Sequence, residues 1–128
     1  MVTGRGKESV GYSLKNLLNQ FDLEDSIFLE DKPRNMAKPN PLSLIEAING
    51  MDVNYPIYVG DSMEDLIMAK KATEQGYKIT FCGIIGTSKT PNEKLQLFDK
   101  NGAFLVLESI NLLPKVLNLE WGKVNFLW

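Results

Sequence analysis

The 128-residue sequence contains no histidine and only one cysteine, Cys82. The first absence excludes histidine-based catalysis and zinc sites with histidine ligands, and the second excludes a disulfide within the chain. Cys82 lies in the apolar run ITFCGIIG, which predicts a buried, reduced thiol. Any metal ion would depend on oxygen ligands, and such ligands favour Mg²⁺.

The sequence also lacks long apolar runs and long runs of like charge. A membrane-spanning helix needs about 18 or more consecutive apolar residues, and no stretch approaches that length. No signal peptide is recognisable at the start of the sequence. The 14 basic and 16 acidic residues are scattered and give a net charge of −2, which predicts neither a nucleic-acid partner nor a membrane partner. We therefore expect a cytoplasmic protein.

Short apolar runs alternate with amphipathic segments along the chain. The end of a strand at residues 2–6 is followed by further predicted strands at 26–31, 56–60, 77–86 and 104–107. Helical spacing is found in residues 8–21, 41–51, 62–76, 90–102 and 109–119. The first of these segments places five apolar residues on one face, namely Val10, Leu14, Leu17, Leu18 and Phe21. The alternation predicts an α/β fold with a mostly parallel sheet in a Rossmann-like, three-layer αβα arrangement.

Three polar clusters follow predicted strands, at residues 3–6, 30–41 and 61–65. In a parallel sheet the carboxyl ends of the strands share one edge, where loops and helix N-termini face a common crevice. We therefore expect the three clusters to lie close together.

The third cluster, GDSMED, has two compatible interpretations. Ser62 and Asp65 have the spacing of a capping box, and acidic residues are favoured in the first turn of a helix. Alternatively, Asp61 and Asp65 stand on one side of the strand-to-helix turn and hold Mg²⁺ directly or through water.

The first two clusters have similar alternatives. Lys38 in KPNP belongs either to an ordinary surface loop or to an extended segment that aims a fixed positive charge at phosphate. Thr3 and Gly4 form either an ordinary turn or a hydroxyl followed by N–H groups that bind an anion. The segment VTGRGK does not match the Walker phosphate loop, because Met1 and Glu8 occupy the positions of its required glycine and hydroxyl residues.

Taken in order, Thr3, KPNP and GDSMED resemble the second, third and fourth motifs of the haloacid dehalogenase superfamily, in particular of its phosphatase-like members. The similarity continues through YKITFCGIIG and KLQLFDKNGAFLVLESINLLPKVL, and it covers residues 2–117. The resemblance implies a Mg²⁺-dependent phosphoester hydrolase that acts on a phosphorylated small molecule.

The resemblance also implies roles for individual residues. Thr3 and Gly4 would bind the transferring phosphoryl group, and Lys38 would stabilise both this group and the nucleophile. Asp61 would be a ligand of Mg²⁺. Asp65 would either share that role or orient Lys38, so that Lys38 and Asp65 are the predicted catalytic residues of this chain.

The sequence departs from the family pattern in its first motif. That motif, DxDx(T/V), supplies the attacking aspartate on the central strand, and no D-x-D occurs in the sequence. The cap that selects substrate in many relatives is missing as well. We therefore interpret residues 1–119 as a partial core that lacks its central nucleophile strand, followed by an aromatic tail at 120–128. Strands ending at Thr3 and Gly60 would each lose a neighbour, so we expect a homo-oligomer or a complementing N-terminal segment.

Three functions remain open at this point. The chain is the C-terminal part of a hydrolase whose aspartyl-phosphate intermediate forms on an aspartate outside it, and it is then inactive in the form given. Alternatively, it is a non-catalytic relic that keeps a phosphate- and Mg²⁺-binding edge and acts as a binding or oligomerising module. A third possibility is a lone enzyme with Glu30 or Asp31 as nucleophile.

Overall fold

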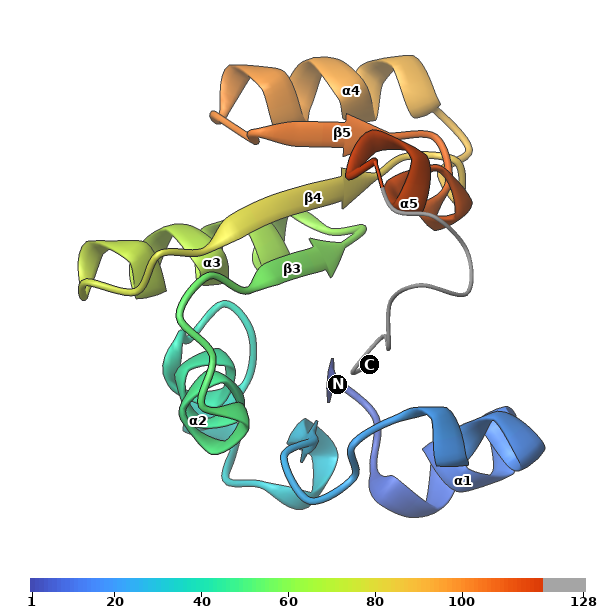
Figure 1. Ribbon diagram of the computed structural model, residues 1–128, viewed down its shortest axis with the longest axis vertical. Helices are drawn as coiled ribbons and strands as arrows, with labels where there is room; N and C mark the ends of the chain where they lie inside the picture. The colour runs from blue at the N-terminus through green and yellow to red at the C-terminus, as the bar shows by residue number, and fades with distance from the viewer. Residues whose placement is uncertain (119–128) are drawn as a thin grey trace.

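The computed structural model describes residues 1–118, so the aromatic tail lies outside the described residues (Figure 1). The secondary-structure elements are, in chain order, β1 (Val2–Thr3), α1 (Lys7–Leu14), β2 (Ile27–Phe28), α2 (Leu42–Met51), β3 (Ile57–Gly60), α3 (Met63–Glu74), β4 (Thr80–Ile84), α4 (Pro91–Lys100), β5 (Leu105–Leu107) and α5 (Leu113–Val116). Helices and strands alternate from β2 onward, as the sequence predicts.

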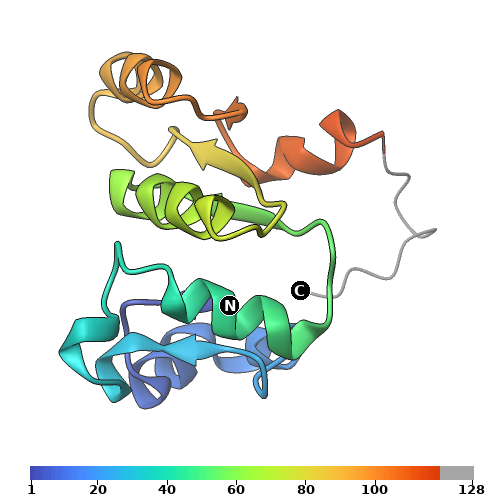
Figure 2. The same cartoon turned by 90° about the vertical axis from the view of Figure 1, so that its left-hand side faces the viewer.

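The described strands form two separate sheets, and both are parallel. β1 pairs with β2, while β4 lies between β3 and β5 in the second sheet. The arrows of β2 and β4 point the same way in Figure 2, so the strands of both sheets share one direction. The predicted α/β class with parallel strands is therefore confirmed.

β1 and β3 are each the end strand of a sheet. Neither has a second strand neighbour within residues 1–118, which agrees with the expectation that these two strands would lack one. Side-chain exposure in the second sheet reflects the end position of β3. Ile57 in β3 is 38% exposed, whereas Phe81 and Cys82 in the central strand β4 are buried. The buried Cys82 thiol agrees with the sequence prediction, and burial raises its pKa.

Helix α2 connects the packing of the two sheets. It contacts β1 and β2, and it also packs against α3. The larger core cluster lies under this helix pair and includes Leu44, Leu66 and Phe98. Phe81 packs edge-on against both Tyr58 and Phe98, with ring centroids 6.1 and 5.7 Å away. The two sheets thus share an apolar helix layer, although no strand within residues 1–118 joins them.

The prediction of one helix over residues 8–21 was wrong. α1 ends at Leu14 because Lys15 adopts a positive φ of 43°, which interrupts the α-helical backbone. The chain continues as a 3₁₀ helix over Lys15–Gln20, and the predicted apolar face breaks up with it. Val10 is buried, whereas Leu17 is 61% exposed.

Other predicted elements are also shorter than expected, among them the strand predicted at 77–86, which is β4 at Thr80–Ile84. β2 covers Ile27–Phe28, and the chain then turns into a 3₁₀ helix over Leu29–Asp31. The last predicted helix begins as a 3₁₀ helix at Ile110–Leu112 and becomes α5 afterwards. None of the helices in residues 1–118 has both the length and the apolar composition needed to span a membrane.

Candidate functional site

The first two polar clusters meet at the N-terminus of α1. The N–H of Gly6 donates to the Glu30 carboxylate, and the N–H of Lys7 donates to the Asp31 carboxylate, each at 2.8 Å. Gly6 has no side chain to cap the helix, so these two carboxylates satisfy N–H groups that the first turn leaves free. Glu30 and Asp31 therefore have a structural task, which argues against either of them as a nucleophile.

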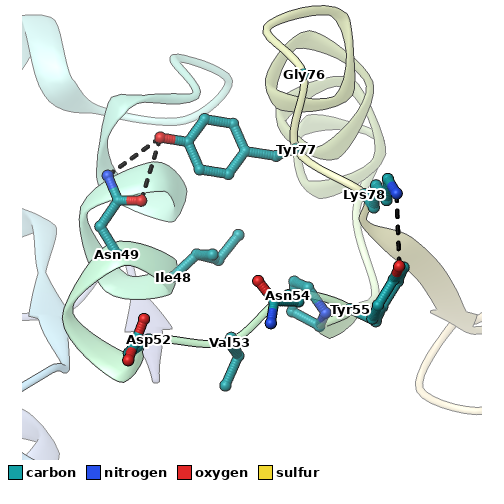
Figure 3. Close-up of a pocket in the computed structure, with 10 residues that line it drawn as sticks. Ile48, Asn49, Asp52, Val53, Asn54, Tyr55, Gly76, Tyr77 and Lys78 are labelled. Atoms are coloured by element: carbon teal, nitrogen blue, oxygen red, sulfur yellow. Dashed lines mark hydrogen bonds between the residues drawn. The ribbon is translucent and has the colours of Figure 1, made fainter.

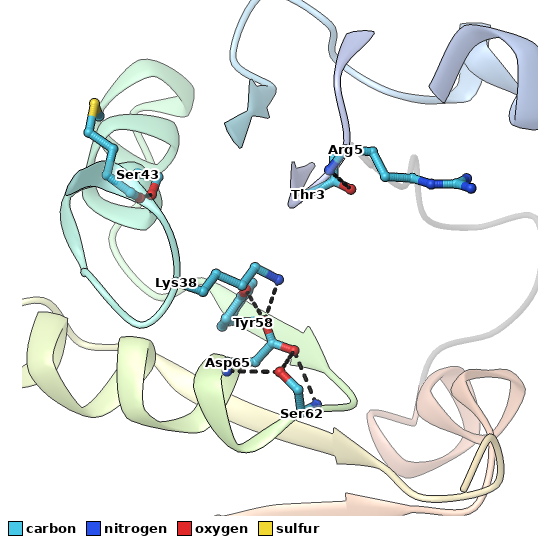
Figure 4. Close-up of polar contacts among 8 residues, drawn as sticks. Thr3, Arg5, Lys38, Ser43, Tyr58, Ser62 and Asp65 are labelled. Atoms are coloured by element: carbon cyan, nitrogen blue, oxygen red, sulfur yellow. Dashed lines mark hydrogen bonds and ion pairs between the residues drawn. The ribbon is translucent and has the colours of Figure 1, made fainter. Parts of the chain in front are cut away.

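The second and third clusters meet through an ion pair between Lys38 and Asp65 (Figure 4). The Nζ atom of Lys38 lies 2.5 Å from Oδ1 of Asp65. The side chains are 19% and 4% exposed, so water screens the pair only weakly. The second cluster thus contacts each of the other two, at Glu30 and Asp31 and at Lys38, and neither contact joins the first cluster to the third.

Asp65 accepts hydrogen bonds at both carboxylate oxygens. The Tyr58 hydroxyl donates to Oδ1 at 2.7 Å, and the hydroxyl and N–H of Ser62 donate to Oδ2 at 2.7 and 3.2 Å. Ser62 in turn accepts from the N–H of Asp65, which completes the predicted capping box of α3. A Cβ atom at Gly60 would lie 2.5 Å from Cβ of Asp65, so glycine is required beside this carboxylate.

The contacts of Asp65 decide its charge. Burial would raise the pKa of this carboxyl, but hydrogen bonds from Lys38, Ser62 and Tyr58 outweigh burial and hold the pKa below its ordinary value. Burial and the adjacent Asp65 charge raise the pKa of Tyr58, so its hydroxyl stays protonated and donates. Of the two roles open for Asp65, these contacts favour orienting Lys38.

Asp61, which directly follows β3, remains the candidate ligand for a metal ion. Its carboxylate accepts a hydrogen bond from the Thr87 hydroxyl at 3.2 Å in an exposed position. Residues 1–118 contain no group of three or more Asp, Glu, His or Cys side chains that would enclose a metal ion. Protein-bound Mg²⁺ usually uses one or two carboxylates and fills its other positions with water and phosphate oxygens. Asp61 fits one such ligand position.

Thr3 is the last residue of β1 and Gly4 follows it, whereas Lys38 lies in the loop that precedes α2 (Figure 4). The Thr3 hydroxyl accepts from the N–H of Arg5 at 3.3 Å, as in an ordinary turn. No atom lies within 4 Å of the position that a Cβ at Gly4 would take, so the turn is open there. Within residues 1–118 no hydrogen bond joins Thr3 to Lys38.

Sequence reasoning missed Tyr58. Side chains two residues apart in a strand lie on the same face, so Tyr58 shares a face with Gly60. Asp65 packs against that glycine. Two features of the sequence could have identified Tyr58. Side chains in a strand repeat on one face every two residues, and Gly60 leaves room for a carboxylate on that face.

A separate pocket of about 420 Å³ lies at the opposite end of β3, beside the end of α2 and the start of the segment into β4 (Figure 3). Some of its polar groups are paired with one another. The Asn49 amide and the Tyr77 hydroxyl are 3.1–3.2 Å apart, and Lys78 lies over the Tyr55 ring at 5.1 Å.

Comparison of the chain with protein-family models, with curated proteins and with solved structures finds no match.

Proposed function

We propose that this chain supplies the phosphate-binding part of a phosphoester hydrolase with a Rossmann-like core of the haloacid dehalogenase type. The main support is the Lys38–Asp65 ion pair at the carboxyl end of β3. A buried carboxylate that accepts hydrogen bonds from Lys38, Tyr58 and Ser62 fixes a lysine at the edge where the β1 turn also ends. A preorganised cation of this kind stabilises charge on phosphoryl oxygens.

In this proposal each residue contributes separately to phosphate binding. An ammonium group has three N–H donors, and Asp65 is the acceptor recorded for Lys38 within residues 1–118. The other donors of Lys38 bind phosphoryl oxygens. The Thr3 hydroxyl and the backbone N–H of Gly4 bind the same group from the end of β1, while Asp65 positions Lys38.

Asp61 would hold Mg²⁺ in the complete site. When bound, the ion would neutralise negative charge on the phosphoryl oxygens. The attacking carboxylate must come from another segment, because the 128 residues contain no D-x-D. The chain alone is then expected to bind phosphate without turning over a phosphoester.

The open edges of β1 and β3 favour a second candidate function. In that alternative the chain is a non-catalytic module that keeps the phosphate- and Mg²⁺-binding edge and associates through its strands. Both candidates require phosphate binding. If another segment supplies the attacking carboxylate, the first candidate should hydrolyse a phosphoester and the second should not.

Phosphate binding is tested on the chain itself by titrating inorganic phosphate with Mg²⁺ and recording backbone amide signals by NMR. We expect the signals of Thr3, Gly4 and Ser62 to shift, and we expect Lys38→Met to weaken the response at least about fivefold. Lys32→Met is the matched control, because Lys32 also precedes a proline but pairs with Glu46 on the surface. Equal responses in both variants would exclude the proposed site.

A further inference from the structure

The pocket of about 420 Å³ lies at the amino end of β3, between the loops that follow two helices. Asn49 and Asp52 line it from the end of α2, and Tyr55 lines it from the loop that leads into β3. Tyr77 and Lys78 come from the segment that connects α3 with β4 (Figure 3). None of these residues belongs to the candidate phosphate site, which follows the carboxyl end of the same strand.

Two side chains of opposite charge line this pocket without forming an ion pair with each other. Neither of the ion pairs found within residues 1–118 includes Asp52 or Lys78. The Nζ atom of Lys78 lies 5.1 Å from the centre of the Tyr55 ring and 3.4 Å from its hydroxyl oxygen. Asp52 lies beside the end of α2 in Figure 3, and Lys78 lies on the opposite side of the pocket. The pocket therefore has a carboxylate on one wall and an ammonium group on the other.

The lining between the two charges is partly apolar. Ile48 is 5% exposed, belongs to the larger core cluster and points from α2 into the pocket (Figure 3). Pro56, which directly precedes β3, adds a second apolar side chain. The Asn49 amide and the Tyr77 hydroxyl are already paired with each other. A ligand can therefore place hydrocarbon against Ile48 while its charged ends lie on either side.

Volume and charge together restrict the class of ligand. The volume of about 420 Å³ falls within the range of about 300–1,000 Å³ that small-molecule sites occupy. A ligand with a single charge would be attracted by one wall and repelled by the other. A ligand with an ammonium group at one end and a carboxylate at the other would be attracted by both walls.

We propose that this pocket binds a small zwitterion, in which an ammonium group and a carboxylate are joined by a short hydrocarbon chain, as in an ω-amino acid. Asp52 binds the ammonium group, Lys78 binds the carboxylate, and the hydrocarbon chain lies against Ile48. The binding site does not depend on the proposed function, because it shares no residue with the phosphate site.

The test is a titration of the full chain with 4-aminobutanoate to about 50 mM, followed by NMR of the backbone amide signals. The signals of Val53, Asn54 and Lys78 should shift and saturate, while those of Thr3 and Gly4 stay unchanged. Butylammonium and butanoate each carry one of the two charges on the same four-carbon chain. Each should bind at least about threefold more weakly than 4-aminobutanoate, because it forms only one of the two exposed charge contacts.

Substitutions assign each end of the ligand to its wall. Asp52→Asn should weaken binding of 4-aminobutanoate and butylammonium at least about threefold without weakening that of butanoate. Lys78→Met should weaken binding of 4-aminobutanoate and butanoate without weakening that of butylammonium. Asp99→Asn and Lys71→Met are the matched controls, because these residues do not line the pocket. All four side chains are exposed, so the substitutions leave the core intact.

Three outcomes would overturn the proposal. They are no saturable shift with 4-aminobutanoate, binding of butylammonium or butanoate as tight as that of 4-aminobutanoate, and equal losses in the control variants. The second outcome would identify a site for a single charge, and the third would show that only the net charge of the chain matters. The phosphate titration of the free chain tests the proposed function separately, so either proposal can fail while the other stands.

Discussion

Lys38 and Asp65, which are 27 positions apart in the sequence, form an ion pair with 2.5 Å between Nζ and Oδ1. This pair ties the KPNP loop to the first turn of α3. It also explains why GDSMED both caps a helix and belongs to a polar site, because Asp65 completes the capping box with one oxygen and holds Lys38 with the other. The helix cap and the fixed lysine charge thus depend on the same carboxylate.

Loss of Lys38 should destabilise the fold strongly. Lys38→Met leaves the carboxylate of Asp65 buried without its cation, and we expect a loss of about 3 kcal/mol in the free energy of unfolding. Lys32→Met removes one partner of an exposed pair with Glu46 and should cost less than about 1 kcal/mol. Urea unfolding of the two variants makes the comparison, and equal losses would show that the buried pair contributes no more than the surface pair.

Stability should fall at low pH through Asp65. The folded state holds the pKa of this carboxyl below the ordinary value of 3.8, so its contribution is complete above that value. The contribution is lost as the pH falls from 3.8 through the lower pKa of the folded state. Urea unfolding between about pH 6 and pH 3 should show this loss in the wild-type chain. Asp65→Asn should be less stable at pH 6 and should change less between the two pH values, and a wild-type slope in this variant would assign the acid sensitivity to other groups.

Asp31 should be important for α1 and unimportant for the phosphate site. Asp31→Asn weakens the acceptor for the Lys7 N–H, and we expect a cost of about 0.5–2 kcal/mol and faster amide exchange at Lys7. The phosphate response of Thr3 and Gly4 should stay within about twofold of the wild type. Hydrolytic activity that disappears with this substitution would instead identify Asp31 as the nucleophile.

Local sequence patterns predicted the elements whose boundaries are set by nearby residues. The capping box of α3 and the start of α4 at Pro91, in the segments predicted at 62–76 and 90–102, both follow from residues within a few positions. The end of α1 did not follow, because no glycine or proline marks the change at Lys15. The end of α1 is caused by the backbone conformation of Lys15, which the helical spacing of apolar residues does not encode.

The candidate site was predicted in its location and only partly in its contacts. Parallel strands place their carboxyl ends together, so the meeting of Lys38 with the GDSMED turn follows from the fold class. The choice between metal ligand and lysine partner for Asp65 depends on contacts from Tyr58 and Lys38, which come from other segments. A spacing rule within one motif contains no information about them.

The most direct test of the proposed hydrolase is the kcat for p-nitrophenyl phosphate hydrolysis by the chain combined with a strand that carries D-x-D, with Mg²⁺ present. Lys38→Ala and Asp61→Asn should each lower kcat at least about 100-fold, because each removes a preorganised charge from the transition state. Lys32→Ala should leave kcat nearly unchanged. A loss below about threefold for Lys38→Ala or Asp61→Asn, or no hydrolysis in the combined wild-type protein, would contradict the assignment.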